Sequence, residues 1–97
     1  MSELLEPVKK ALRLTSDVFD DEVQDLIESA RSDLIQSGVS PLVAKKEDDP
    51  LIRRAVILYC KAHFGMDNPD AVRFAQSFDM LKQHLTLAGD YSGDAVE

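Results

Sequence analysis

This sequence of 97 residues is poor in the features that mark most specialised protein classes. Its single cysteine, Cys60, has no partner for an internal disulfide, so the fold does not depend on an oxidising compartment. No apolar run reaches the roughly 20 residues of a membrane span, and the N-terminus lacks a signal-peptide pattern. Glycine and proline number only four each and stand mostly at segment ends, which disfavours a turn-rich sheet protein. We therefore expect a soluble, cytoplasmic, helical protein that makes no contact with a membrane.

Basic residues are also scarce, since 11 Lys and Arg face 18 Asp and Glu and the net charge is −7. Such a chain is a poor candidate for wrapping nucleic acid, because phosphate binding needs clustered Lys and Arg. The charge is uneven: residues 15–37 carry seven acidic residues against Arg31 alone, whereas residues 38–66 have a small positive balance. Two interpretations stay open. The acidic stretch is either a solvated helix face or a surface that meets an oppositely charged surface of a like subunit.

The segment 49–65 predicts the central helix of the fold. Asp49 is suited to cap the first turn, Pro50 fits the first helical position, and Gly65 readily adopts the left-handed conformation that ends a helix. Further apolar residues make the inward face of this helix broad, so that little of the helix except three basic side chains is expected to face water. A helix with this pattern belongs in the middle of the fold. Helical spacing places six residues on one face: Ile52, Ala55, Val56, Tyr59, Ala62 and His63.

Three further helices are predicted around it, over residues 3–13, from Asp20 or Asp21 to Ser37, and from Pro69 to about Leu87. Phe19 is expected to pack as a hydrophobic staple against the first turn of the second helix. Residues 38–48 are expected to form a loop, because Ser40-Pro41 disfavours helix. In the last helix, Asn68 is the expected cap and five residues the inward stripe: Val72, Ala75, Phe78, Leu81 and Leu85.

The fold class that follows is all-α, a small bundle of about four helices around a central apolar helix at residues 50–64. Residues 1–89 form a single domain on this interpretation. Residues 90–97 are short, acidic and interrupted by glycine, so we expect a mobile C-terminal tail.

No constellation of residues indicates catalysis or a cofactor. Cys60, His63 and His84 offer too few ligands at recognised spacing for zinc, and no third residue orients a cysteine nucleophile. The acidic residues between Asp17 and Asp25 lack the alternating oxygen ligands and central glycine of a calcium loop. Glycine-rich phosphate loops and Ser-His-Asp signatures are absent as well. We therefore expect no enzyme, no metal and no cofactor.

The order of four sequence segments along the chain resembles that of a known protein family. Residues 5–14 read LEPVKKALRL, residues 19–34 read FDDEVQDLIESARSDL, residues 49–65 read DPLIRRAVILYCKAHFG, and residues 78–82 read FDMLK. Together they resemble the phage head–tail connector family, the small helical neck adaptors of tailed phages and prophages. The resemblance covers nearly the whole chain and depends on a pattern of helices, not on catalytic residues.

The resemblance implies a structural protein of the virion neck, assembled in the cytoplasm of the bacterial host. Members form a homo-oligomeric ring, here expected to hold about 12–13 subunits, beneath the portal protein. The ring extends the DNA channel without sequence-specific DNA binding and receives the next neck or tail protein. Contacts with neighbours would come from the loop 39–48 and the tail 90–97.

A hypothesis for the subunit contacts pairs the acidic second helix with cations of the next subunit, while apolar contacts supply the affinity. Its residues are Asp21, Asp25, Glu28, Leu42, Val43, Lys45, Lys46, Arg53 and Arg54. Two alternatives stay open. One is a small acidic adaptor or regulator that binds one partner helix in a groove. The other is an acidic mimic of DNA that inhibits a nucleic-acid enzyme.

Overall fold

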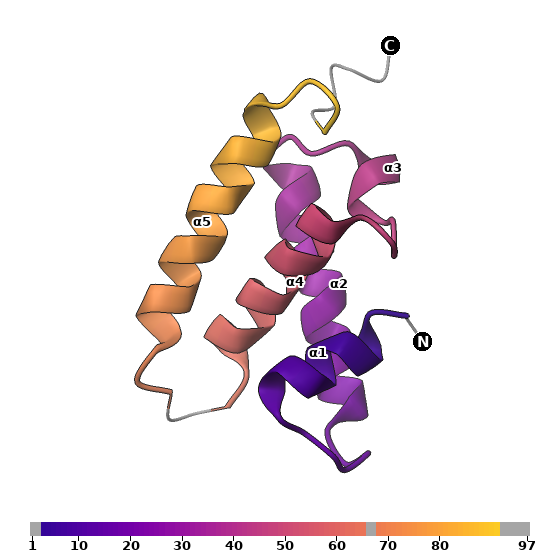
Figure 1. Ribbon diagram of the computed structural model, residues 1–97, viewed down its shortest axis with the longest axis vertical. Coiled ribbons are helices and arrows are strands. Elements are labelled where there is room, and N and C mark those ends of the chain that lie inside the picture. The colour runs from indigo at the N-terminus through magenta and orange to yellow at the C-terminus, as the bar shows by residue number, and fades with distance from the viewer. Residues whose placement is uncertain (1–2, 66–67, 92–97) are drawn as a thin grey trace.

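A computed structural model gives the architecture of residues 3–65 and 68–91, so residues 1–2, 66–67 of the predicted turn and 92–97 of the predicted tail lie outside the described residues. The fold is all-α, as predicted (Figure 1). Its helices are α1 (Leu5–Leu12), α2 (Asp20–Gln36), α3 (Pro41–Ala44), α4 (Pro50–His63) and α5 (Ala71–Leu87). Within the described ranges, none of the helices has both the length and the apolar character needed to cross a membrane.

Helix α4 is the centre of the bundle, as its sequence predicts, because α1, α2 and α5 all pack against it. The Asp49 carboxylate accepts hydrogen bonds from the backbone N–H groups of Leu51 and Ile52, at 2.9 and 3.1 Å, and so caps the helix. Pro50 occupies the first helical position and Gly65 has a φ of +84° just beyond the end. The local signals and the tertiary position of α4 therefore agree.

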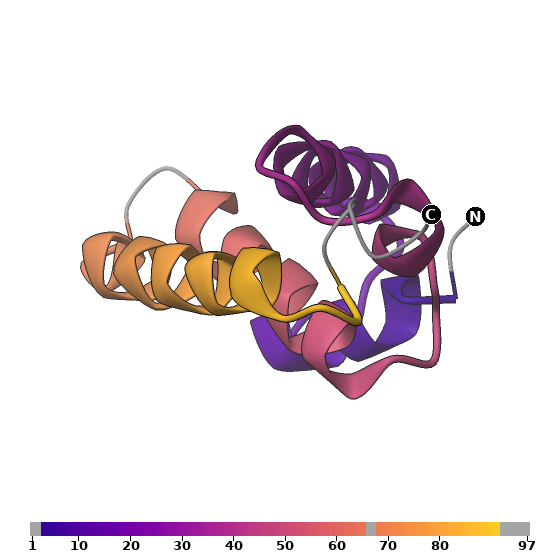
Figure 2. The ribbon, with the colours of Figure 1, turned by 90° about the horizontal axis from the view of Figure 1, so that it is seen from above.

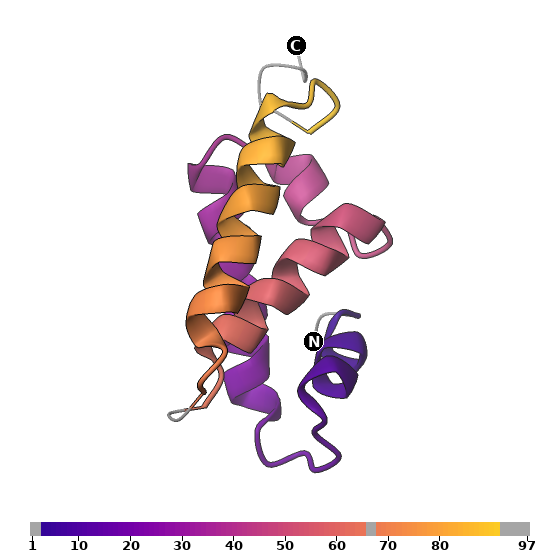
Figure 3. The same cartoon turned by 60° about the vertical axis from the view of Figure 1, so that its left-hand side comes forward.

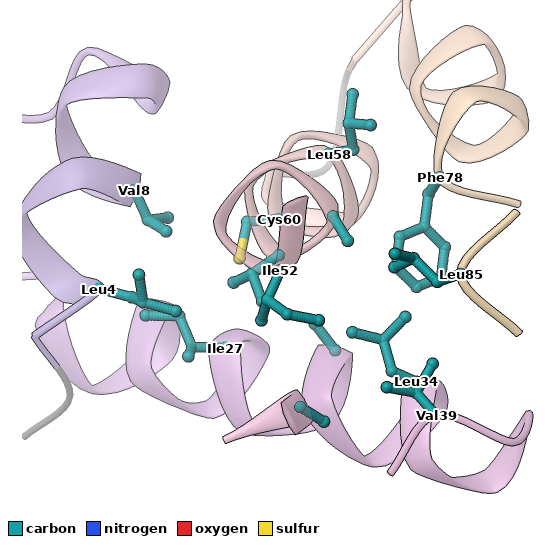
Figure 4. Close-up of a cluster of buried hydrophobic side chains, with 14 of the residues drawn as sticks. Leu4, Val8, Ile27, Leu34, Val39, Ile52, Leu58, Cys60, Phe78 and Leu85 are labelled. Carbon is teal, nitrogen blue, oxygen red and sulfur yellow. The ribbon is translucent and has the colours of Figure 1, made fainter. Parts of the chain in front are cut away.

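The core gathers apolar side chains from α1, α2, α3, α4 and α5 and from the turn after α2 (Figure 4). Burial of these side chains supplies most of the stabilisation, at about 25 cal/mol per Å² of apolar surface. The largest apolar side chains that are fully buried are Leu4, Val8, Val23, Ile27, Leu34, Val39, Ile52, Val56 and Leu85.

The segment 38–48 is not simply a loop, and this prediction was wrong. Pro41–Ala44 forms the short helix α3, with Ser40 as its extended N-cap residue at ψ 133°. The residue before a proline prefers this extended conformation, and proline is tolerated in the first helical turn, so Ser40-Pro41 starts a helix here. Helix α3 then packs against α2.

Several predicted positions of single side chains were also wrong. The Phe19 ring packs edge-to-face against Phe64 at 5.4 Å, so the predicted staple does not describe its main ring contact. Asp70, not Asn68, precedes α5 as its N-cap residue. His63 and Val72 were assigned to inward faces and are exposed. His63 is the last residue of α4, and Val72 lies about 120–140° around α5 from the buried Phe78 and Leu85.

Helices α4 and α5 form an antiparallel hairpin, and α5 lies at the edge of the molecule. Seen from above, α5 occupies one side and α3 the other, with α4 between them (Figure 2). A turned view places α5 in front, with α4 passing obliquely behind it (Figure 3). Helix α5 packs chiefly against α4, and this leaves much of its surface uncovered.

Candidate interaction surfaces

The exposed side of α2 forms an acidic face, which we define as Asp21, Asp25 and Glu28. The helical repeat turns these residues away from the core-facing stripe of the same helix. Arg31, the only cation of α2, is buried: its Nε donates to the carbonyl oxygen of Ala44 at 3.2 Å, and its Nη2 lies 3.0 Å from Glu47. Its Nη1 also lies 3.4 Å from Glu28 Oε2, so Arg31 partly offsets the charge of Glu28 as well as holding the segment after α2. Among the described residues, Asp21 and Asp25 form no ion pair, and the acidic face keeps their negative charge.

An open groove of about 600 Å³ runs along this face. Tyr59 of α4 contributes to it, and the Tyr59 ring also meets Phe78 of α5 at 5.2 Å, so the groove lies on the α5 side of α2. Its lining from α2 is Asp25, Glu28, Ser29, Ser32, Asp33 and Gln36.

An ion pair joins α2 to α5 beside the groove. Lys82 Nζ lies 2.8 Å from Asp33 Oδ1, and this hydrogen bond raises the pKa of Lys82 above its usual value. Lys82 therefore neutralises the charge of Asp33 within the chain. Since Glu28 is likewise paired with Arg31 at 3.4 Å, the negative charge of the acidic face that is still available to a partner is chiefly that of Asp21 and Asp25.

The predicted cations lie just after α3, at Lys45 and Lys46, and at the start of α4. We define the basic surface as Leu42, Lys45, Lys46, Arg53 and Arg54, all of which are exposed. Within residues 3–65 and 68–91, none of these four cations forms an ion pair with an acidic side chain. The Leu42 side chain is 73 % exposed. This surface therefore offers positive charge beside an apolar side chain.

The structure does not bring the predicted acidic and basic residues together within one chain. Helix α3 and the start of α4 lie on the opposite side of the molecule from α5 and the groove beside it (Figures 1 and 2). Val43 is half-buried and packs against the core, and its contact with a neighbouring subunit stays a prediction. The arrangement provides two separate surfaces of opposite charge.

Tyr91 is a contact residue that the sequence analysis missed. Its hydroxyl donates to the Asp49 carboxylate, with oxygen–oxygen distances of 3.2 and 3.0 Å. Its carbonyl oxygen accepts a 2.7 Å hydrogen bond from the backbone N–H of Ser40. Burial, followed by the hydrogen bond to Asp49, raises the pKa of Tyr91. The signal in the sequence that could have indicated this contact is that Tyr91 is the one aromatic residue of the acidic segment 90–97.

Cys60, His63 and His84 occupy different environments. Cys60 is fully buried, and burial raises the pKa of its thiol to about 12, so the thiolate that metal binding or nucleophilic attack requires is disfavoured. The two histidines are exposed, and the His63 ring rests on Tyr59 at 4.3 Å. Among the described residues, no group of three or more His, Cys, Asp or Glu side chains is placed to hold a metal ion.

These features define a small helical protein whose distinctive parts are interaction surfaces. The family model described as phage connector protein matches residues 4–92, and the chain belongs to that family. Its role is that of a structural connector at the neck of a phage particle, where it associates with other head or tail proteins. Neither the curated proteins nor the solved structures compared with the chain gave a match.

Proposed function

We propose that this connector forms a homo-oligomeric ring of about 12–13 subunits between the portal protein and the tail or next neck component. The ring extends the channel through which DNA leaves the capsid. It assembles in the cytoplasm of the bacterial host and performs no reaction.

The separation of the acidic face from the basic surface is the observation that carries the proposal. A ring of identical subunits needs two different, complementary surfaces on each subunit, related by a rotation that closes. The acidic face lies on α2, and the basic surface lies on α3 and the start of α4. Each exposed ion pair is worth only about 0–1 kcal/mol, so the charges fix the register while apolar contacts hold the subunits together.

The net charge of −7 is consistent with DNA that passes through the ring without being bound by it. Tight, sequence-independent binding requires several cations that replace the counterions of the phosphates. A ring built from this chain repels DNA over most of its surface, and the duplex slides through.

Charge reversal tests the proposed subunit contact. We expect R53E/R54E to weaken assembly by about tenfold, because two attractive contacts become repulsive. The measurement is sedimentation velocity over a concentration series. K10E/R13E is the matched control, since it changes the net charge equally and both residues are exposed on α1 or at its end.

A charge swap makes the test specific. Combining R53E/R54E with D25K/E28K restores assembly on this proposal, because the pairs reform with reversed polarity. Equal behaviour of R53E/R54E and the wild type, with intact helicity in circular dichroism, contradicts the proposed contact.

The groove along α2 favours a second candidate function, that of an adaptor which binds one basic partner helix. On this alternative the chain stays monomeric, and D25K/E28K abolishes partner binding while R53E/R54E leaves it unchanged.

A further inference from the structure

Helix α5 carries two apolar stripes on opposite sides. The inward stripe includes Phe78 and Leu85, which are buried against α4 and the core. The second stripe contains Val72, Met80 and Leu87, whose side chains are 69 %, 72 % and 86 % exposed. Packing within the chain explains the first stripe and leaves the second unexplained.

Helical geometry places the exposed residues on one narrow face. At about 100° per residue, positions 72, 76, 80, 83 and 87 fall within an arc of about 80°, opposite the buried residues. The two other positions are Gln76 and Gln83, so the face carries no charge. In a chain of net charge −7, such a face is a place where two copies can approach without repulsion. We define these five residues as the outer stripe: Val72, Gln76, Met80, Gln83 and Leu87.

Nothing in the described part of the chain covers the outer stripe. Helix α5 packs chiefly against α4 through its other side; it lies at the edge of the bundle in Figures 1 and 2 and in front of the other helices in Figure 3. Exposed apolar residues that line up along one helix mark an interaction surface more often than isolated ones do. The exposed apolar residues of the outer stripe therefore indicate a contact with another molecule.

The other side of the molecule offers a matching surface. Leu42 is 73 % exposed and Leu51 is 37 % exposed, and both stand beside the cations of the basic surface. The groove of α2, with Asp25 and Glu28, lies on the α5 side of that helix. A second copy that lays Leu42 and Leu51 on the outer stripe thus brings its cations toward acidic residues.

We infer that the outer stripe of α5 binds the Leu42–Leu51 surface of a second copy of this chain. The inference rests on the proposed ring, for which it supplies the apolar contact. Two α5 helices pairing with each other fit less well, because that pairing brings none of the cations of the basic surface to the acidic side of the molecule.

Cysteine cross-linking tests the pairing directly. L42C and M80C are placed on separate chains, and the native Cys60 is buried and does not compete. We expect a covalent dimer when the two single variants are mixed under mild oxidation, and none from either variant alone. The double variant L42C/M80C is expected to give a ladder of covalent oligomers, because each copy then links to two neighbours.

The outcomes separate this inference from the proposed ring. Closed rings in images without an L42C–M80C cross-link overturn the inference and leave the ring standing. Cross-linked open chains without closed rings support the inference and contradict the ring. A covalent dimer of M80C alone overturns the inference in favour of α5 self-pairing. A chain that stays monomeric and gives no cross-link at the highest concentration reached overturns it as well.

A second measurement checks the energetic role of the stripe. We expect M80E to weaken association by about tenfold or more, because burial of a large apolar side chain is worth roughly that factor. V18E is the matched control, since Val18 is 79 % exposed and lies before α2, away from both surfaces. Equal association constants for M80E and V18E contradict the inference.

Discussion

At the scale of single residues, Asp49 joins two distant parts of the chain. Its carboxylate caps α4 through the N–H groups of Leu51 and Ile52 and also accepts the hydroxyl of Tyr91. The cap was predictable from the Asp-Pro pair, since it depends only on local sequence. The contact with Tyr91 was not predictable, because it bridges 42 positions and depends on how the chain after α5 turns back toward Ser40 and the start of α4.

We expect D49A to destabilise the protein by about 1–2 kcal/mol, since it removes both the helix cap and the acceptor for Tyr91. D49N keeps a capping side chain and costs less. Y91F removes only the hydroxyl and serves as the control for the second contact. Urea denaturation measures all three, and a D49A midpoint equal to that of the wild type contradicts the assigned role.

Cys60 makes the stability depend on pH in the alkaline range. Burial raises the pKa of the thiol from 9.0 to about 12, so the folded state holds the proton more tightly than the unfolded state. The associated stability is fully present below pH 9 and is lost progressively as the pH rises toward 12. By pH 10 the expected loss is about 1 kcal/mol.

The check is chemical unfolding at pH 8 and pH 10 for the wild type and C60A. We expect C60A to lose less stability over this interval, since no thiol then ionises. A thiol reagent should also react slowly with the native protein at pH 8 and rapidly after denaturation. Fast reaction of the folded chain contradicts burial of Cys60.

At the scale of secondary-structure elements, the helices predicted from sequence were those with a clear apolar period. Helix α4 also had a capping residue, and the structure confirms the predicted ends of α2 and α4 to within about one or two residues. Helix α3 was missed because four residues are too few for a period to appear. Val72 was misplaced because repeated steps of three residues drift around the helix, so that Val72 lies about 120–140° from the buried Phe78 and Leu85.

The contact between α1 and α2 includes Lys9, which is buried, although the helical spacing of residues 3–13 predicts it on the outward face. Lys9 Nζ lies 2.8 Å from Asp20 and 3.3 Å from Asp17, and the hydrogen bond to Asp20 is the main cause that raises the pKa of Lys9. With a raised pKa, this contribution is present at neutral pH and is lost only when the pH exceeds about 10.5.

We expect D20N to destabilise the protein more than D17N, because the Asp20 side chain is 20 % exposed and that of Asp17 is 92 % exposed. Thermal unfolding followed by circular dichroism at pH 7 ranks the two variants. The reverse order, or two equal midpoints, contradicts the assignment of Asp20 as the principal partner.

At the scale of the whole molecule, the charges of the interaction surfaces were predictable and their geometry was not. Counting charges along the chain identified the acidic segment and the basic residues of α3 and α4. The groove beside Tyr59 and the outer stripe of α5 depend on how helices pack. The sequence pattern of α5 was interpreted as one apolar stripe, whereas the structure separates its apolar residues onto two faces.

The family and the surfaces together support one account, in which the chain is a structural connector whose two unlike sides meet around a ring. The native mass of the purified protein over a concentration series, alone and with the portal protein, tests this claim most directly, with negative-stain images of any large species. The account predicts closed rings of about 12–13 subunits, formed freely or on the portal. A monomer or dimer under every condition, including with the portal protein, contradicts it.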